Sequence, residues 1–404
     1  AGDSPTTTTQ MFQVTGLTAS NVVMEFTKER IVACINNKVY EISTTATALP
    51  TAVYTHPVDD FVYTSITSSG AAIYVTGFSG TQSNIQKFTL ASNGTMPTLT
   101  SAITAAEMPS GERIYKIAYY LGYMMIGTTK GIRAAVVSDD GSLAYGPLIW
   151  ENTQPVYDFC FRDKYAWAAT GVEDEPGTIR LDLGTQISPL VFPYAYDTYS
   201  ETGNTTHETT ACAFIDGTDR ICFTTNATAT EDGSVYIESD TRLVSSGYLQ
   251  TGFVRYNTLE GKIFKLLTPR IDTTNGGLDI ASVAYDYTEY PIGSFSQQST
   301  VSEIGIPYPQ GPQEYLGFKF TLTRDTNDDT LGPLFTGYQL KSLPPSLLSG
   351  QYRILLYGSP LFGWYRLRFL QLQVVAYAAK QSLQSQQVLQ TYLLLCHSRT
   401  VDIG

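Results

Sequence analysis

Apolar and polar residues follow one another along this chain in a unit of three short strands, which recurs from about residue 58 to residue 239. Each copy begins with an apolar strand, written twice as Val-x-Asp-Phe at 58–61 and 156–159. A tight turn leads to a second apolar strand that ends in a Thr/Gly cluster, and a half-polar third strand follows. Because the same unit returns, the pattern predicts an all-β chain that contains the blades of a β-propeller.

The threonines of the Thr/Gly clusters recur at intervals close to the ~40–50 residues of a four-stranded blade. The equivalent positions are Thr76, Thr128, Thr170 and Thr224. A weaker copy at 23–42 brings the count to five blades, and Met11–Leu17 would complete a sixth. Dipeptides such as Asn36-Asn37 and Asp216-Gly217 lie between apolar runs, as hairpin turns do. The alternative is a β-sandwich with irregular strand lengths, but a sandwich does not require the same three-strand unit each time.

The repeat ends near Ser245, and the composition changes there. We therefore predict an N-terminal segment (1–22) that closes the ring, a propeller of five to six blades (23–244) and an antiparallel β-sandwich (245–345). The remaining residues, 346–404, form a C-terminal docking segment that has no acidic residue from Ser346 through Val401. Within it, the residue preferences of Lys380–Leu395 favour a helix.

The charge of the chain narrows the function classes. The 404 residues carry a formal net charge of −12, and only 15% of them are charged. An acidic chain without a Lys/Arg run is a poor match for nucleic acid, which requires clustered cations. The most apolar stretch, Leu361–Ala379, contains Arg366 and Arg368 and is broken by polar residues, so we expect no membrane span.

The cysteines and histidines give no sign of a metal site or a cofactor. None of the five cysteines forms a Cys-x-x-Cys pair, and the three histidines are scattered. Cys212 and Cys222 lie at equal distances from Gly217, so a hairpin centred there would place them opposite each other, as a disulfide needs. Two buried thiols are the alternative, since free cysteine is commonly buried.

Enzyme signatures are also missing. The chain has no Gly-x-Ser-x-Gly, phosphate loop, dinucleotide fingerprint or His-Glu-x-x-His. Propellers include glycosidases, which need two carboxylates across a cavity. The candidate acids are Glu173, Asp174, Glu175, Glu231 and Asp232. Acids beside Gly and Pro are ordinarily solvated turn residues, and this is the favoured interpretation. The acidic run Asp325–Asp329 lacks the Gly and the distant Glu of a calcium loop, and we interpret it as the tip of a hairpin between Phe318–Thr323 and Leu334–Leu340.

Tyrosine is the residue type that points most clearly to binding. The chain has 28 of them, many near turns, and their flat amphipathic rings suit stacking on sugars or filling a protein interface. The alternative is that most of them bridge strand cores to water. The best candidate for a recognition surface is Phe192–Thr210 with the nearby acidic pair. Its candidate residues are Tyr194, Tyr196, Tyr199, Glu173 and Asp174, and other turn tyrosines are Tyr287, Tyr290 and Tyr308.

Several phrases of this sequence resemble one protein family. They are Ile126–Arg133, Asp140–Leu148, Ser246–Gly252 leading into Thr258–Lys262, and Gly332–Pro344. In these segments the chain is similar to the minor tail proteins of tailed bacteriophages, especially long-tailed phages of actinobacteria. Beyond Pro345 it departs from that family, which usually continues with a more charged segment.

The resemblance implies a structural virion protein at the tail tip or in a tail fibre, built as a propeller followed by a sandwich. It would bind other phage tail proteins and a host cell-surface glycan or protein, as a homo-oligomer, without catalysing a reaction. The alternative function is a carbohydrate-active propeller enzyme, a glycosidase that acts on the cell envelope.

Overall fold

The computed structural model describes residues 10–14, 22–343 and 399–402, apart from short internal segments at 71, 152–153, 173–174, 200–207, 226–232, 257–259, 272–274, 297–305 and 309–311. The described residues form strands and turns, with no α-helix among them. No helix in this described part is therefore long and apolar enough to cross a membrane. The chain separates into two compact units. The first comprises residues 1–239 and 401–404, and the second comprises residues 240–400.

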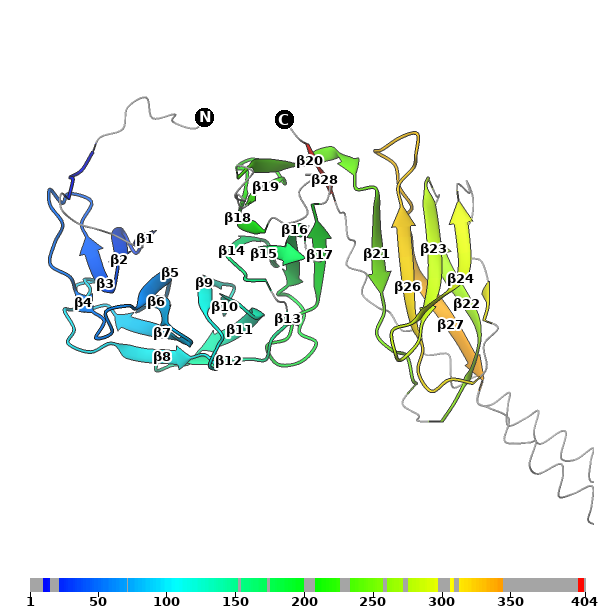
Figure 1. Cartoon of the computed structure of the whole chain (residues 1–404), viewed down its shortest axis with the longest axis horizontal. Coiled ribbons are helices and arrows are strands. Elements are labelled where there is room, and N and C mark those ends of the chain that lie inside the picture. Colours follow the sequence, from blue (N-terminus) through cyan, green and yellow to red (C-terminus); the bar gives the residue numbers. More distant parts are fainter. Residues whose placement is uncertain are drawn as a thin grey trace, which may run out of the picture. The chain divides into compact units, whose positions relative to one another are not determined.

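The first unit consists of five consecutive antiparallel sheets, which we call blades 1 to 5 (Figure 1). Blade 1 contains β1 (Val22–Thr27), β2 (Arg30–Ile35), β3 (Lys38–Ile42) and β4 (Tyr54–Thr55). Blade 2 contains β5 (Val62–Ser69), β6 (Ala72–Ser79), β7 (Gln82–Thr89) and β8 (Ile103–Glu107). Blade 3 contains β9 (Ile114–Tyr120), β10 (Tyr123–Thr128), β11 (Gly131–Val137), β12 (Leu143–Tyr145) and β13 (Trp150–Glu151).

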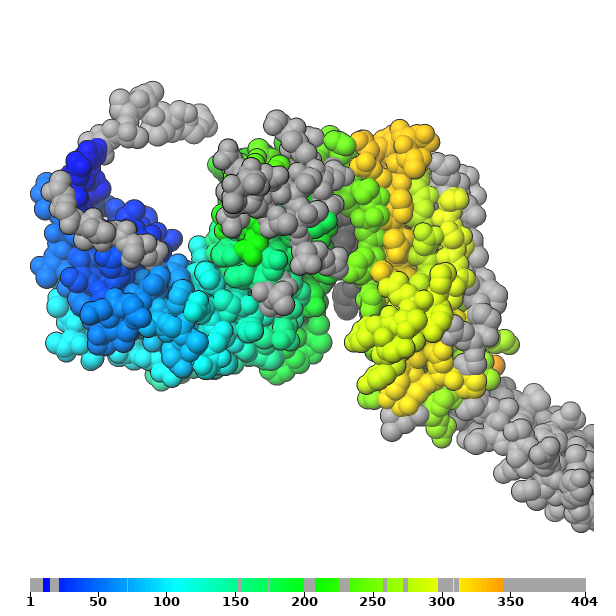
Figure 2. All heavy atoms as spheres, in the orientation of Figure 1, coloured from blue at the N-terminus to red at the C-terminus, as the bar shows by residue number. Residues whose placement is uncertain are grey.

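Blade 4 contains β14 (Asp158–Arg162), β15 (Tyr165–Val172), β16 (Glu175–Asp182) and β17 (Tyr194–Thr198). Blade 5 contains β18 (Thr209–Phe214), β19 (Ile221–Thr225) and β20 (Val235–Leu243), and β28 (Arg399–Asp402) lies beside β20 in its sheet. The first strands of the blades contact one another in sequence order, from β1 to β5, β9, β14 and β18. Apolar clusters fill the space between each blade and the next, so successive blades touch in Figure 2. The prediction of an all-β propeller is confirmed.

The repeated Thr/Gly cluster has a structural explanation. Thr76, Thr128 and Thr170 are fully buried. Thr76 Oγ1 donates to the Asn84 carbonyl at 2.8 Å and Thr170 Oγ1 to the Pro155 carbonyl at 2.9 Å, whereas Thr128 Oγ1 donates to the Glu112 carboxylate at 3.1 Å. A buried hydroxyl needs such a partner. A Cβ on Gly127 would lie 2.8 Å from Val156 of the next blade, so this position requires glycine. The Thr/Gly cluster therefore recurs because each blade packs closely against the next.

A buried ion pair fixes the entry to blade 3. Glu112 is only 3% exposed. Its carboxylate accepts two hydrogen bonds from Arg133, at 2.7 Å from Nε and 2.9 Å from Nη2, and a third from Thr128 Oγ1 at 3.1 Å. This bidentate geometry is the arrangement in which a buried pair of charges is satisfied.

The second unit is an antiparallel β-sandwich. One sheet has the order β21 (Ser246–Gln250), β26 (Gly317–Thr323), β23 (Gly277–Val283) and β24 (Glu289–Ser296). The other has the order β25 (Ile306–Pro307), β22 (Ile263–Ile271) and β27 (Phe335–Leu343). Phe264, Leu267, Phe318 and Phe320 are among the side chains that pack between the two sheets.

Three sequence predictions have different outcomes here. The predicted hairpin between Phe318–Thr323 and Leu334–Leu340 is wrong, because β26 pairs with β21 and β23 while β27 pairs with β22. The connection crosses from one sheet to the other. Of the predicted sixth-blade segment, Phe12 packs on the Ala33 face of blade 1, and 15–17 lie outside the described residues. The C-terminal segment, including Lys380–Leu395, also lies outside them up to β28.

Candidate functional site

The predicted recognition segment forms the last strand of blade 4 and the chain that follows it. On β17, the Tyr194 side chain is 44% exposed, whereas Tyr196 is half-buried against the apolar cluster between blades 3 and 4. Residues 200–207, Glu173 and Asp174 lie outside the described residues, as do Glu231 and Asp232. Of the three tyrosines, Tyr194 alone is exposed.

Tyr199 differs from the prediction. It is 2% exposed, its ring stacks on Phe223 with centroids 3.8 Å apart, and its hydroxyl hydrogen-bonds Thr178 Oγ1 at 2.9 Å. Burial raises the pKa of this phenol well above its usual value. Tyr199 is therefore part of the core between blades 4 and 5, and it does not contribute to a surface.

Asp197, two residues before Tyr199, is the most perturbed carboxyl of this region. Burial raises the pKa of Asp197 to about 6, against the opposing effect of the nearby Arg180 guanidinium. In the sheet it pairs with Thr178 of β16. A carboxyl of this kind titrates close to neutral pH, which ordinary aspartates do not.

The predicted disulfide is wrong. Cys212 pairs with Phe223 and Ala213 pairs with Cys222 across β18 and β19, so the hairpin is centred between Gly217 and Thr218. An offset of one residue puts the two cysteines on opposite faces of the sheet. Both are free thiols, Cys212 buried and Cys222 half-buried.

Two carboxylates, each with its own partner, lie near the beginning of the inner strands of blades 4 and 5. We call this group the inner-strand cluster (Lys116, Tyr157, Asp158, Glu208). Lys116 Nζ lies 2.8 Å from Asp158 Oδ1, and the Tyr157 hydroxyl donates a hydrogen bond to Glu208. The pKa of Tyr157 is raised by burial and then by that carboxylate. The inner-strand cluster thus consists of two pairs, Lys116 with Asp158 and Tyr157 with Glu208, which link blade 3 to blade 4 and blade 4 to blade 5.

Asp158 and Glu208 are not among the candidate acids predicted from the sequence. The available signal was the repeat itself, because Asp158 is the acid of the second Val-x-Asp-Phe unit. Asp60 holds the same place in the first unit, and it accepts a hydrogen bond from Ser79 at 2.7 Å. The structure therefore places the two equivalent acids in different surroundings.

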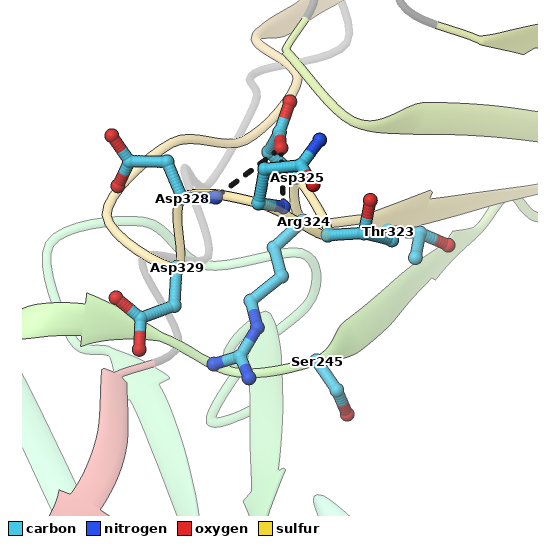
Figure 3. Close-up of a pocket in the computed structure, with 8 residues that line it drawn as sticks. Ser245, Thr323, Arg324, Asp325, Asp328 and Asp329 are labelled. Atoms are coloured by element: carbon cyan, nitrogen blue, oxygen red, sulfur yellow. Dashed lines mark hydrogen bonds between the residues drawn. The ribbon is translucent and has the colours of Figure 1, made fainter.

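A polar hollow lies over the connection between β26 and β27 (Figure 3). Its volume is about 570 Å³, and Ser245 and Thr323–Asp329 line it. The Asp325 carboxylate accepts from the backbone N–H groups of Asn327 at 2.7 Å and Asp328 at 3.3 Å. Asp328 accepts from Thr330 Oγ1 at 2.6 Å and from Thr330 N at 3.0 Å, and these two hydrogen bonds lower the pKa of Asp328. The acids thus support their own loop, and no group of three or more metal-binding side chains occurs among the described residues.

Four aromatic side chains form a continuous surface on the sandwich unit. We call it the aromatic platform (Phe253, Tyr285, Tyr287, Tyr315). The ring centroids are 5.6 Å apart for Phe253 and Tyr287, 6.0 Å for Phe253 and Tyr285, and 5.7 Å for Tyr285 and Tyr315. Tyr285 is 74% exposed and Tyr287 68% exposed. Contiguous exposed aromatic surface of this kind is typical of an interaction site.

The backbone holds the centre of the platform in place. Thr251 N donates to the Phe318 carbonyl at 2.8 Å and Val254 N to the Leu316 carbonyl at 2.9 Å, which fixes the residues on both sides of Phe253. The Phe253 ring lies against Gly317 of β26, 3.5 Å from where a Cβ would be. Tyr285 and Tyr287 come from the turn between β23 and β24, so three separate segments build the surface.

Polar groups border the platform. The Tyr315 hydroxyl hydrogen-bonds the Glu314 carboxylate, which raises the pKa of Tyr315, and it also meets Arg255. On β26, Lys319 Nζ pairs with Glu289 at 2.8 Å and lies 4.4 Å from the ring centre of Tyr248. The sequence pattern pointed to Tyr287 and to Tyr290, which is 43% exposed. It did not point to Phe253, Tyr285 or Tyr315, because only the fold brings these residues together.

Comparisons with known proteins add likeness of fold alone. No family model matches the chain, and no curated protein matches it. Among solved structures, a glycoside hydrolase family 43 arabinoxylan arabinofuranohydrolase from Bacillus subtilis is similar with 10% identity and a TM-score of 0.29, over 80% of this chain and 95% of that one. The exo-β-1,3-galactanase from Phanerochaete chrysosporium has 6% identity and a TM-score of 0.34, over 80% and 96%.

The Pan2 WD40 domain from Neurospora crassa is similar over 54% of this chain and 60% of that one, with 8% identity and a TM-score of 0.33. At such scores the similarities carry no argument about chemistry.

Proposed function

We propose that this chain is a structural component of a phage tail, at the tip or in a fibre, which recognises the host cell surface without catalysing a reaction. The observation that carries the proposal is the exposure of Tyr285 and Tyr287 on a fixed aromatic platform. Rigid tyrosines supply large contact areas at low entropic cost, which suits binding. The sequence phrases similar to minor tail proteins supply the biological setting.

The proposed partners are other tail proteins and a host glycan or protein, with the chain as a homo-oligomer in the virion. In such an oligomer, copies of the chain would be arranged around a common symmetry axis. The acidic charge of −12 keeps nucleic acid out of the set of partners.

Adsorption to bacteria tests recognition. A fluorescently labelled chain is mixed with actinobacterial cells and the cells are sedimented. We expect the chain to sediment with the cells, and the variant Tyr285→Ala/Tyr287→Ala to remain in solution. Tyr119→Ala is the matched control, since this tyrosine is also exposed (36%) but lies on β9. Equal sedimentation of all three proteins would contradict the proposal, and antibody labelling of purified particles in the electron microscope tests the tail location.

Glycoside hydrolysis is the second candidate, and the inner-strand cluster is the observation that favours it. Two carboxylates from neighbouring blades are what acid–base or nucleophilic cleavage of a glycosidic bond requires. In this reading Asp158 and Glu208 are the two acids, and the Lys116 and Tyr157 partners orient them.

Incubation with cell-wall polysaccharide separates the two candidates. For a recognition protein we expect no release of reducing ends by the wild-type chain. Release that disappears in both Asp158→Asn and Glu208→Gln, but persists in Asp219→Asn, would replace the proposed function with the enzyme. Asp219 is a suitable control because its side chain is 83% exposed.

A further inference from the structure

Three hairpin loops of this chain share one hydrogen-bonding pattern. They span 91–95, 138–142 and 284–288. In each, the first residue's N–H donates to the carbonyl of the fifth at 2.8–2.9 Å, and its carbonyl accepts from the N–H of the fourth at 2.7–2.9 Å. In each, an Asn or Asp at the third position accepts from the N–H of the fifth at 2.9–3.1 Å. The loops are therefore three copies of one backbone structure, a three-residue hairpin loop whose last residue is left-handed.

The fourth position of these loops differs in residue type. It is Gly94 (φ 79°) in the first, Gly141 (φ 78°) in the second and Tyr287 (φ 63°) in the third. A left-handed conformation is free of strain for glycine but costs stability for a side chain with a Cβ. Two of the three loops thus follow the backbone preference, and the third carries a bulky aromatic residue against it.

Packing within the protein does not offset this strain. The Tyr287 side chain remains 68% exposed, and its ring meets Phe253 edge-on, at 5.6 Å between centroids and 62° between planes. Little apolar area is removed from water by such a contact. Residues held in unfavourable backbone conformations gather at binding sites, where the constraint presents a side chain in a fixed position. The ring at 287 is presented outward.

The chemistry of the platform indicates its ligand. Aromatic faces attract the C–H groups of a pyranose ring, and the hydroxyls of the same ring can bond to the bordering Asp286, Glu314 and Arg255. The carboxylates repel an anionic polymer. Neighbouring rings are tilted by 42° for Phe253 and Tyr285 and by 33° for Tyr285 and Tyr315, so the surface is curved. A curved surface fits a soluble, turning polysaccharide chain better than the flat face of a crystalline one.

We infer that the aromatic platform is a saccharide-binding site, on which Tyr285 and Tyr287 stack against pyranose rings of a neutral polysaccharide. The inference names the ligand class of the proposed recognition function and rests on that function for its biological setting. Tyr287 occupies a glycine position because its ring contacts the ligand.

Affinity electrophoresis of the full chain tests this directly, with dextran, mannan and galactan as the polysaccharides in the gel. We expect at least one of them to retard the wild-type protein. Tyr285→Ala weakens this binding about tenfold. Tyr287→Gly introduces the residue that the loops at 91–95 and 138–142 have at this position. It also weakens binding about tenfold, while it raises the urea concentration at the midpoint of unfolding.

Tyr287→Phe keeps the ring and retains binding within about threefold, and Tyr119→Ala leaves binding unchanged. Because Tyr287→Gly is expected to gain stability, a loss of binding cannot be ascribed to misfolding. Retardation by none of the three polysaccharides, or a Tyr287→Gly variant that binds like the wild type, overturns the inference.

Treated cells distinguish failure of this inference from failure of the proposed function. Periodate cleaves the vicinal diols of sugars, whereas protease removes protein receptors. Adsorption that is lost after periodate supports the saccharide site. Adsorption that survives periodate but is lost after protease leaves the recognition function standing and overturns the saccharide site. Retardation in the gel without any adsorption to cells supports the site and overturns the function.

Discussion

At the scale of single residues, Asp197 gives this protein a pH dependence of stability near neutrality. Its carboxyl has a pKa of about 6 in the folded chain, because burial disfavours its charged form. The unfolded chain binds that proton only below its ordinary pKa of ~3.9. The contribution to stability is thus full at low pH and is lost as the pH rises from about 4 through about 6.

Asp197→Asn removes this dependence. We expect the free energy of unfolding of the wild type, relative to the variant, to fall by about 2 kcal/mol between pH 4 and pH 7, since one pKa unit corresponds to ~1.4 kcal/mol and the unfolded chain has lost about half of this proton at pH 4. Urea unfolding at several pH values, followed by tryptophan fluorescence, measures it. The exposed Asp219→Asn is the control. Parallel curves for wild type and Asp197→Asn would contradict this account.

At the scale of elements, the strands were predictable from the sequence and some of their neighbours were not. Period-two patterns and turn dipeptides located the second and third strands of the blades, as at 23–42 and 123–137. The predicted first strand at 58–61 is wrong, because these residues form the turn before β5, which begins at Val62. The register between two strands must be known to a single residue, and a hydrophobic pattern does not locate a turn that accurately. Cys212 and Cys222 were therefore predicted to lie opposite each other on the same face of the sheet. The pairing of β26 and β27 failed for a related reason, because a short polar loop joins two sheets as readily as two neighbouring strands.

The buried pair of Glu112 and Arg133 links the segment before β9 to β11 by two hydrogen bonds. Glu112→Gln leaves the guanidinium of Arg133, 12% exposed, without a counter-charge. We expect the free energy of unfolding to fall by about 3 kcal/mol. Chemical unfolding measures this loss. Glu112→Gln/Arg133→Met should lose less than the sum of the single changes, whereas additive losses would show that the two side chains do not act as a pair.

At the scale of the whole molecule, two compact units predict two unfolding transitions. Phe88 is fully buried in the propeller and Phe320 in the sandwich. In calorimetry, Phe88→Ala should lower the midpoint temperature of one transition only, and Phe320→Ala that of the other. Each substitution should reduce the free energy of unfolding of its own unit by about 3–5 kcal/mol. A single transition that responds to both substitutions would contradict independent folding of the units.

The sequence predicted the architecture of the molecule better than its sites. Repeats and composition report packing, and packing determines the fold, so the propeller and the sandwich could both be inferred. The platform and the inner-strand cluster each combine residues from three separate segments. No local pattern connects Phe253 with Tyr285, or Tyr157 with Glu208, because these contacts exist only after folding.

The tyrosine at position 287 also has an evolutionary consequence. Under selection for stability alone, this position would drift to glycine, which gains about 1 kcal/mol in a left-handed turn and is already present at 94 and 141. A lineage that keeps an aromatic residue there is selected for what the ring does. When such a lineage changes its host, the pressure on the ring changes as well. Position 287 should then be among the first positions in the sandwich to change, and the residue type found there should differ between lineages with different hosts.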